Sequence, residues 1–287
     1  MLENVTSERK IGGTWHMMRS LWSAASGMKG QQVSVDTIAN NLANVNTTAY
    51  KSQSTQFKTL LYQTMQSTST NGQGETKPTS AQVGLGTRVA SINANFTQGS
   101  QLAKDSPTAM CIIGNGFFAV EDGDETHYTR NGDFTWALDD GGNKVLTTSE
   151  GYKVLDQAGR PITVPNTVEK GFTVNPDDGS ISYQNPDGTY TNTGQSIALY
   201  QFTNRVGLDK IGENLYDETA ASGEPMGEWN TQGVNRSSIA QNYLEGSNVN
   251  VADEMVSLII AQRAYEMNSK AITTSDTMLE QANNLKR

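Results

Sequence analysis

Hydrophobic residues near both ends of the chain recur at helical spacing. In the N-terminal segment, one series steps by seven residues and a second falls three residues after each member, which predicts a helix over 17–46. The first series is Leu21, Met28, Val35 and Leu42, and the second is Ala24, Gln31, Ile38 and Val45. In the C-terminal segment a similar series predicts a helix over 247–287, and its members are Val251, Leu258, Tyr265, Ile272 and Leu279.

These two hydrophobic stripes are interrupted by polar positions and are rich in small residues. Each could belong to an amphipathic helix packed on its own domain, but this composition is more typical of surfaces that pack against several neighbours. Because a helix whose apolar stripe lacks a partner is marginal in water, we expect the ends to become ordered on assembly. The expected assembly seam consists of Leu21, Met28, Val35, Ile38, Leu42, Val251, Leu258, Tyr265, Ile272 and Leu279.

The segment between the predicted helices has a different composition. All seven prolines lie between Pro78 and Pro225, and 23 of the 27 glycines lie between Gly72 and Gly246. Because Gly and Pro break regular helices, we predict a central, mainly β domain rich in hairpins over 72–246. Strand-like runs cover 111–120, 127–129, 134–138, 144–148, 171–174, 180–183 and 197–203. Turn dipeptides occur at Asp122-Gly123, Asn131-Gly132, Asp140-Gly141, Asp178-Gly179 and Asp187-Gly188.

The expected fold class is therefore α+β, with the two terminal segments helical and the middle built of strands. Residues 1–16 are polar and lack the seven-residue pattern, so we expect an appendage or tag-like extension and leave it out of the fold. Residues 47–71 contain neither Gly nor Pro and are expected to form an ordered linker segment between the first helix and the β domain.

Charge and composition exclude several function classes. The net charge of −9 argues against nucleic acid as a partner. One cysteine, Cys111, excludes a disulfide framework, and two histidines, His16 and His127, leave little material for a metal site or a catalytic triad. No apolar run approaches the roughly 20 residues of a membrane helix, and residues 1–16 lack the apolar segment of a cleavable signal peptide.

Candidate chemical motifs are weak. The acidic segment Asp122–Glu125 resembles a calcium loop superficially but lacks its full ligand spacing, so a hairpin turn is expected. The glycines around Asn115 and Leu85 do not form a dinucleotide-binding motif. His127 has no nucleophile nearby in the sequence and is expected to be structural or exposed. The sequence does not exclude a pair of carboxylates that are far apart in the chain and meet in the folded protein. We expect no enzyme activity, no cofactor and no metal.

Several motifs that occur in order along the chain resemble the signatures of bacterial flagellar rod and hook proteins. The first is Ala39, Asn40, Asn41, Leu42, Ala43 and Asn44, followed by the segment 48–51. Central motifs lie at 113–120, 128–134 and 212–216. The last is 244–251, followed by Gln262, Arg263, Ala264, Tyr265 and Glu266. The resemblance covers 17–287. Within the family the chain is most similar to the distal-rod type.

The resemblance implies that the two terminal helices pair as a coiled-coil-like inner domain lining a hollow tube, with the β domain outside. It further implies a structural subunit of the distal rod that polymerises into a helical drive shaft and transmits motor torque to the hook. Residues 47–71 would stiffen the tube. The family usually has Gly-Phe where this chain has Ala49-Tyr50, and Ala would be strained if that position needs a positive φ.

The resemblance also implies partners and a location. The partners would be further copies of the chain in a helical homopolymer and other rod and hook proteins, and they could include basal-body ring proteins. The chain would work in the flagellar basal body, outside the cytoplasmic membrane, and would be exported without a cleaved signal peptide. A hook-type or proximal rod subunit is the near alternative. A soluble β-rich carbohydrate-binding or hydrolytic protein is the distant one, and it would need a pocket with convergent carboxylates or aromatic rings.

Overall fold

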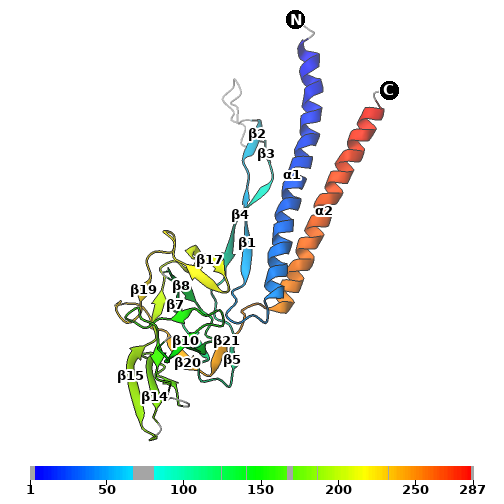
Figure 1. Ribbon diagram of the computed structural model, residues 1–287. Helices are drawn as coiled ribbons and strands as arrows, with labels where there is room; N and C mark the ends of the chain where they lie inside the picture. The colour runs from blue at the N-terminus through cyan, green and yellow to red at the C-terminus, as the bar shows by residue number, and fades with distance from the viewer. Residues whose placement is uncertain are drawn as a thin grey trace. The chain divides into compact units, whose positions relative to one another are not determined.

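A computed structural model describes residues 4–66, 81–123, 125–139, 141–166, 171–185, 187–231 and 233–285, without the side chains of 4–18, 66 and 81. The chain divides into two compact units. Unit 1 takes the described residues of Met1–Leu42, Gln53–Asn93 and Asn250–Arg287, and unit 2 those of Ala43–Ser52 and Ala94–Val249. Helices at both ends and a strand-rich region between them confirm the α+β class (Figure 1).

Unit 1 consists of two long helices and four strands. Its elements are α1 (Asn4–Ala43), β1 (Gln53–Thr59), β2 (Tyr62–Gln66), β3 (Ala81–Gly84), β4 (Thr87–Ala94) and α2 (Val251–Asn284). β1 pairs with β4, and β2 pairs antiparallel with β3. The expected linker 47–71 thus contributes two strands, whose partners lie beyond it, while its residues 67–71 fall outside the described range. Residues 4–16, which we set aside as an appendage, continue α1.

Small residues on α1 allow the strands to lie close to it. A Cβ added to Gly30 would stand 3.0 Å from Phe57 Cε1 of β1, so a larger residue there would displace the ring. Near the end of α1, the side-chain amide of the buried Asn41 bonds to the backbone of Gln53 as a neighbouring strand would. Its Oδ1 accepts from Gln53 N at 2.9 Å and its Nδ2 donates to Gln53 O at 2.8 Å. One amide therefore fixes where β1 begins.

The two helices of unit 1 contact one another in antiparallel register. Three contacts follow one another by a multiple of seven residues along α1 and by the same number back along α2, which is heptad spacing. The pairs are Ser20 with Ser275 (Oγ–Oγ 3.3 Å), Gly27 with Asn268, and Asn41 with Glu254 (Nδ2–Oε1 3.0 Å). Small and polar residues stand at these three contacts, and the leucine series of α1 is partly buried as well.

Unit 2 is built almost entirely of short strands. They are β5 (Gln101–Ala103), β6 (Met110–Ile113), β7 (Phe117–Asp122), β8 (Glu125–Thr129), β9 (Thr135–Leu138), β10 (Lys144–Thr147), β11 (Lys153–Val154), β12 (Thr163–Val164), β13 (Thr173–Val174), β14 (Ser180–Gln184), β15 (Tyr190–Ser196), β16 (Leu199–Gln201), β17 (Asp209–Gly212), β18 (Leu215–Asp217), β19 (Met226–Gly227), β20 (Ser238–Gln241) and β21 (Tyr243–Glu245). A 3₁₀ turn covers Arg205–Gly207. The main sheet runs β12-β10-β11-β7-β8-β18-β17, and β16, β19 and β9 pair beside this path.

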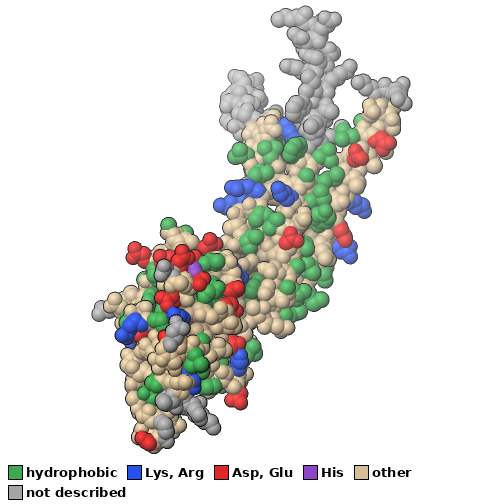
Figure 2. Space-filling view, viewed as in Figure 1, with side chains coloured by type: hydrophobic (Ala, Val, Ile, Leu, Met, Phe, Trp, Pro, Cys, Tyr) green, Lys and Arg blue, Asp and Glu red, His purple; other side chains and the backbone are tan. Residues whose placement is uncertain are grey.

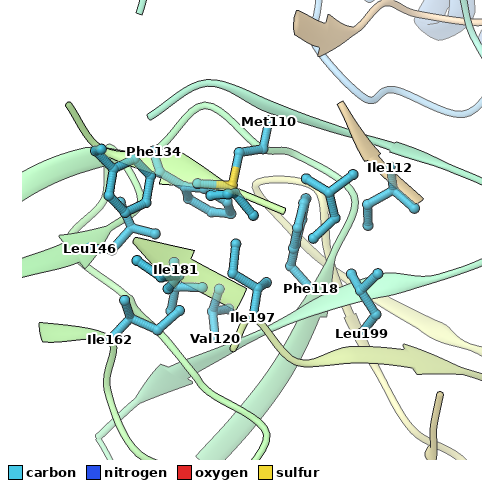
Figure 3. Packing of buried hydrophobic residues seen from close by; sticks show 14 of the residues in the cluster. Met110, Ile112, Phe118, Val120, Phe134, Leu146, Ile162, Ile181, Ile197 and Leu199 are labelled. Atoms are coloured by element: carbon cyan, nitrogen blue, oxygen red, sulfur yellow. The ribbon is translucent and has the colours of Figure 1, made fainter. Parts of the chain in front are cut away.

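Two hydrophobic clusters hold unit 2 together. The larger packs Met110, Ile112, Phe118, Val120, Phe134, Leu146, Ile162, Ile181, Ile197 and Leu199 with five further buried residues (Figure 3). The smaller is aromatic, and its rings meet edge to face, which their quadrupoles favour. It includes Phe117, Tyr128, Phe202 and Tyr216. Because strand neighbours point to opposite faces, Phe117 and Phe118 enter different clusters.

Most predicted turns join paired strands, but one does not. Hairpins β7–β8, β9–β10, β13–β14 and β14–β15 enclose four of the five dipeptides, although Asp140 itself lies outside the described residues. Asn131-Gly132 joins strands that do not pair with each other. A Cβ at Gly132 would stand 1.8 Å from Met110 O, so this glycine serves a close backbone approach.

The predicted strand over 111–120 is wrong as a single element. β6 and β7 divide it and join different sheets, β20–β6 and the main sheet. The break falls at Gly114, whose φ of +134° is a conformation that side chains disfavour. Ala49 has the positive φ that the sequence comparison brought into question, at +57°, and it is buried.

Candidate functional site

The outer side of α2 presents an apolar surface. Asn250 caps the helix by accepting from Ala252 N at 3.1 Å, and the acidic Asp253 and Glu254 in the first turn suit the helix dipole. Just beyond this start, four apolar side chains are between 52% and 63% exposed. We name this group, Met255, Val256, Ile259 and Ile260, the α2 patch. Figure 2 shows hydrophobic side chains gathered along this helix.

The inner side of α2 carries smaller residues. Ala261 is buried, and Asn268 and Ser275 lie at the contacts with α1 already described. Of the predicted seam residues on α2, Leu258, Ile272 and Leu279 are partly buried, whereas Val251 and Tyr265 are exposed. On α1, Ile38 is buried, and Leu21, Met28, Val35 and Leu42 are partly buried.

The motif residues of the two helices play different parts within unit 1. Asn41 is buried in bonds to Gln53 and Glu254, while Ala39, Asn40 and Ala43 are exposed and Leu42 and Asn44 are partly buried. Gln262, Arg263 and Tyr265 of the second motif are exposed, and Ala264 is partly buried. The Arg263–Glu266 ion pair of 3.1 Å is solvated, so it contributes little to stability. A hollow of about 400 Å³ is lined by Gln32, Val35, Gln262, Tyr265 and Glu266.

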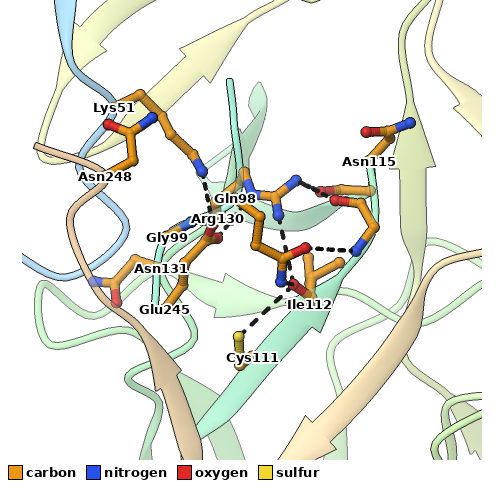
Figure 4. A network of polar contacts seen from close by, with 12 residues as sticks. Lys51, Gln98, Gly99, Cys111, Ile112, Asn115, Arg130, Asn131, Glu245 and Asn248 are labelled. Carbon is orange, nitrogen blue, oxygen red and sulfur yellow. Dashed lines mark hydrogen bonds and ion pairs between the residues drawn. The ribbon is translucent and has the colours of Figure 1, made fainter. Parts of the chain in front are cut away.

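A buried ionic cluster lies inside unit 2 (Figure 4). Glu245 accepts from Lys51 Nζ at 2.7 Å through Oε1 and from Arg130 Nε at 2.9 Å through Oε2. The Gly99 amide adds a third bond at 3.0 Å. None of the three charged side chains is more than 1% exposed. Lys51 lies near the end of the segment Ala43–Ser52 and Glu245 near the end of Ala94–Val249, so the cluster joins the two chain segments of unit 2.

The charges of this cluster shift one another's titration. Burial alone would raise the pKa of Glu245, but the nearby Arg130 and Lys51 outweigh it and hold that pKa below its usual range. Burial lowers the pKa of Lys51, and the Arg130 charge adds to this effect. All three residues lie within motifs of the sequence, at 48–51, 128–134 and 244–251, but no local pattern indicated that they pair.

The residues singled out for chemistry are structural. His127 is buried and its Nδ1 pairs with Asp217 Oδ1 across neighbouring strands. Cys111 is buried in β6, and burial raises the pKa of its thiol to about 11, so it is held as an unreactive thiol. Among the described residues, no group of three or more His, Cys, Asp or Glu could hold a metal ion. No described helix is long and apolar enough to cross a membrane.

Carboxylates and an indole do meet at one hollow of unit 2. It measures about 220 Å³ and its lining includes Asp177, Asp178, Glu228 and Trp229. The buried Glu228 is already engaged, because it accepts from Gln201 Nε2 at 2.7 Å and from Ser237 N at 2.6 Å. Trp229 packs edge to face on Tyr200 with its ring centroid 5.1 Å away. These contacts assign both residues to the fold.

Comparison with known proteins identifies the family. Three family models match in chain order. They are "Flagella basal body rod protein" over 21–51, "Flagellar hook protein FlgE/F/G D1 domain" over 111–183 and "Flagellar basal body rod FlgEFG protein C-terminal" over 240–285. The flagellar basal-body rod protein FlgG of Borreliella burgdorferi is 44% identical over 275 residues, which cover 94% of this chain and all of that protein. The chain belongs to the FlgG family.

Other relatives agree with this assignment. The FlgG protein of Bacillus subtilis is 38% identical over 271 residues, again 94% of this chain and all of its own length. A second protein of that species, the hook-basal body complex protein FlhP, is 29% identical over 280 residues, 94% of this chain and all of FlhP. The chain is thus a structural subunit of the distal-rod type. The FlgG relatives carry the names of rod proteins and not of enzymes.

Proposed function

We propose that this FlgG-family chain polymerises through its two helices into the helical shaft of the distal rod, which transmits motor torque to the hook. The observation that carries the proposal is the α2 patch. Soluble monomers rarely keep large contiguous apolar groups in water, so such a patch is typical of an interaction site. Burying the exposed half of each side chain against a neighbour would contribute about 1 kcal/mol per residue.

The inner domain of the polymer would be a coiled-coil-like pair formed by α1 and α2. Support comes from the heptad steps between Ser20–Ser275, Gly27–Asn268 and Asn41–Glu254. Part of the apolar surface of the helices is covered within one chain, and the exposed part is available for contacts with other chains. The seam would combine the α2 patch with the exposed Val251 and Tyr265, and with the partly buried leucines of both helices.

A helical polymer needs a contact between different surfaces that does not close into a ring. The outer side of α2 and a neighbour's α1 provide two such surfaces. Trp22 on α1 is 70% exposed and is an apolar side chain available for this contact. Repetition of that contact would build the tube. Other rod and hook proteins, and basal-body ring proteins, would be the further partners at its ends and around it.

The proposed location is the basal body outside the cytoplasmic membrane, reached by export without a cleaved signal peptide. A thiol buried in β6, in a chain with a single cysteine, suits a protein that needs no disulfide.

The test places a charge in the α2 patch. Ile260→Asp removes little packing within the chain, because this side chain is 63% exposed, but it would bury a carboxylate in the polymer at a cost of several kcal/mol. We expect purified Ile260→Asp to fold like the parent by circular dichroism. Rods isolated from cells producing it should contain less than a tenth of the parent amount of this chain.

The matched control is Thr273→Asp, which adds the same charge at an exposed position of α2 away from the patch. It should enter rods at close to the parent level. Normal incorporation of Ile260→Asp would show that the patch is not an assembly surface.

A further inference from the structure

Unit 2 also contains a polar recess. It measures about 540 Å³ and opens to solvent. Its walls come from the segment leading to β5, the turn between β6 and β7, and the 3₁₀ turn. Thr97, Gln98, Gly114, Asn115, Asn204 and Arg205 are among the residues that line it.

Cationic side chains stand behind or within each wall. Lys51 Nζ donates to Thr97 O at 2.9 Å, and Arg130 Nη1 donates to Gly114 O at 3.0 Å. Arg205 lines the recess itself and donates from Nη1 to Asn115 Oδ1 at 2.8 Å. Figure 4 shows Lys51 and Arg130 converging on this region, with Gln98 and Asn115 beside them.

The charges around the recess do not balance. Three cations face one carboxylate, Glu245, and that carboxylate is occupied by Lys51 and Arg130. In the described part of the chain, Arg205 forms no ion pair, and its Nη1 donates to a neutral amide. Burial lowers the pKa of Arg205 and the Arg130 charge lowers it further, as expected for crowded like charges. A partly buried cation without a counter-ion favours an incoming anion.

We propose that this recess binds a carboxylate side chain from unit 2 of a second copy of the chain. The inference rests on the proposed function, because it needs copies to lie side by side. A guanidinium presents paired N–H donors that match the two oxygens of a carboxylate. The chain has 30 Asp and Glu against 21 Lys and Arg, so a neighbouring copy offers an acidic surface.

The recess also has an apolar rim that suits a protein neighbour. Val206, next to Arg205, is 52% exposed, and Phe96 lines the same hollow. A carboxylate on a side chain brings a methylene stem to such a rim, whereas a bare inorganic anion does not. An arginine at an edge with apolar neighbours is a common anchor of protein interfaces.

The first arm of the test uses acetate as the probe on the purified full chain. Ligand that binds only the folded state raises the unfolding temperature. At equal ionic strength, replacing 100 mM chloride with acetate should raise it by about 3 °C in the parent. Arg205→Gln should lose this shift, and Arg205→Lys should keep part of it. Arg236→Gln, which removes an exposed arginine of the same unit, should retain it.

The second arm measures the amount of the Arg205→Gln chain in isolated rods, with Arg236→Gln as the control. Protection of the buried Cys111 thiol in each purified variant checks that unit 2 is folded. The proposal expects at least a fivefold loss for Arg205→Gln alone. An acetate shift with normal incorporation would mean that the recess takes free carboxylates and would overturn the second-copy occupant.

Absence of any acetate shift in the parent would overturn the site itself. These outcomes are distinct from a failure of the proposed function. If Ile260→Asp is excluded from rods while Arg205→Gln enters normally, the α2 patch stands and only the recess proposal falls. If both variants enter normally, the assembly surfaces are placed wrongly.

Discussion

At the scale of residues, charge pairing and backbone strain meet where the two chain segments of unit 2 join. Glu245 holds Lys51 and Arg130 through its side chain, and its carbonyl accepts from the strained Ala49 amide at 2.8 Å. Paired buried charges add little over an apolar core of the same shape, but removing one partner leaves the others uncompensated. The cluster therefore specifies how the two segments join more than it adds stability.

Removal of the central carboxylate should be costly. Glu245→Gln keeps the shape but leaves two cations buried, so we expect a loss of about 3 kcal/mol or more in unfolding free energy. Asp133→Asn is the control, because the Lys104–Asp133 pair is equally short at 2.7 Å but solvent-exposed. It should cost less than about 1 kcal/mol. Urea unfolding followed by Cys111 labelling measures both, and equal losses would contradict the account.

The Glu245 carboxylate also makes the stability of the folded chain depend on pH in the acid range. The pKa of Glu245 is lowered in the folded chain, so its contribution is present above the unfolded pKa of about 4.3 and is lost as pH falls through the folded value. The parent should lose stability over this range more steeply than Glu245→Gln. Parallel curves for the two proteins would show that Glu245 is not the group responsible.

The strain at Ala49 gives a stabilising substitution. A φ of +57° costs a residue with a side chain about 1–2 kcal/mol relative to glycine. Replacement by glycine gains only part of this, because glycine has more conformational entropy in the unfolded state. Ala49→Gly should therefore raise the unfolding free energy by about 0.5–1 kcal/mol. Ala198→Gly, at a buried position without positive φ, should lower it. A loss of stability in Ala49→Gly would mean that the buried methyl group outweighs the strain.

At the scale of elements, the sequence predicted the existence of both terminal helices. Heptad spacing of apolar residues found α1 and α2, because buried stripes must repeat at the helical period. It did not point to the contacts at Ser20, Gly27 and Asn41, because periodicity detects apolar residues and misses contacts made by small or polar ones. That Leu21 and its series form an assembly seam stays a prediction.

The strand pairing and the charged cluster could be predicted from the sequence only where the signal is local. Turn dipeptides found the hairpins of unit 2, because their backbone needs are local. The pairing of β1 with β4 depends on residues far apart in the chain, and its strands show no regular alternation of burial. Lys51, Arg130 and Glu245 are likewise scattered in the sequence, so only the fold could bring them together.

The β2–β3 ladder can be removed without opening the rest of unit 1. Leu60 N donates to Gly86 O at 2.9 Å, so a short Asn-Gly turn can replace 61–85 and keep β1 paired with β4. If this segment stiffens the tube, the shortened chain should still enter rods but give more flexible or curved ones in electron micrographs. Rods as straight and stiff as the parent's would refute a stiffening role for 61–71, the part of the 47–71 segment that this change removes.

At the scale of the whole molecule, the chain combines a sheet-rich unit that buries its own core with a helical unit that leaves apolar residues in water. The first is complete in one chain, as its two clusters show. The second keeps Met255, Val256, Ile259 and Ile260 exposed. FlgG-family membership supplies the reason for the difference, because a rod subunit needs neighbours. Whether the helices form before assembly stays a prediction.

The most direct measurement is the solvent accessibility of position 260 before and after assembly. Ile260→Cys adds an exposed thiol, while the native Cys111 is buried and reacts only on unfolding. We predict rapid labelling of residue 260 in the purified chain and at least tenfold slower labelling in isolated rods. Equal labelling rates in the two states would show that α2 faces solvent in the rod, and the proposed assembly surface would be wrong.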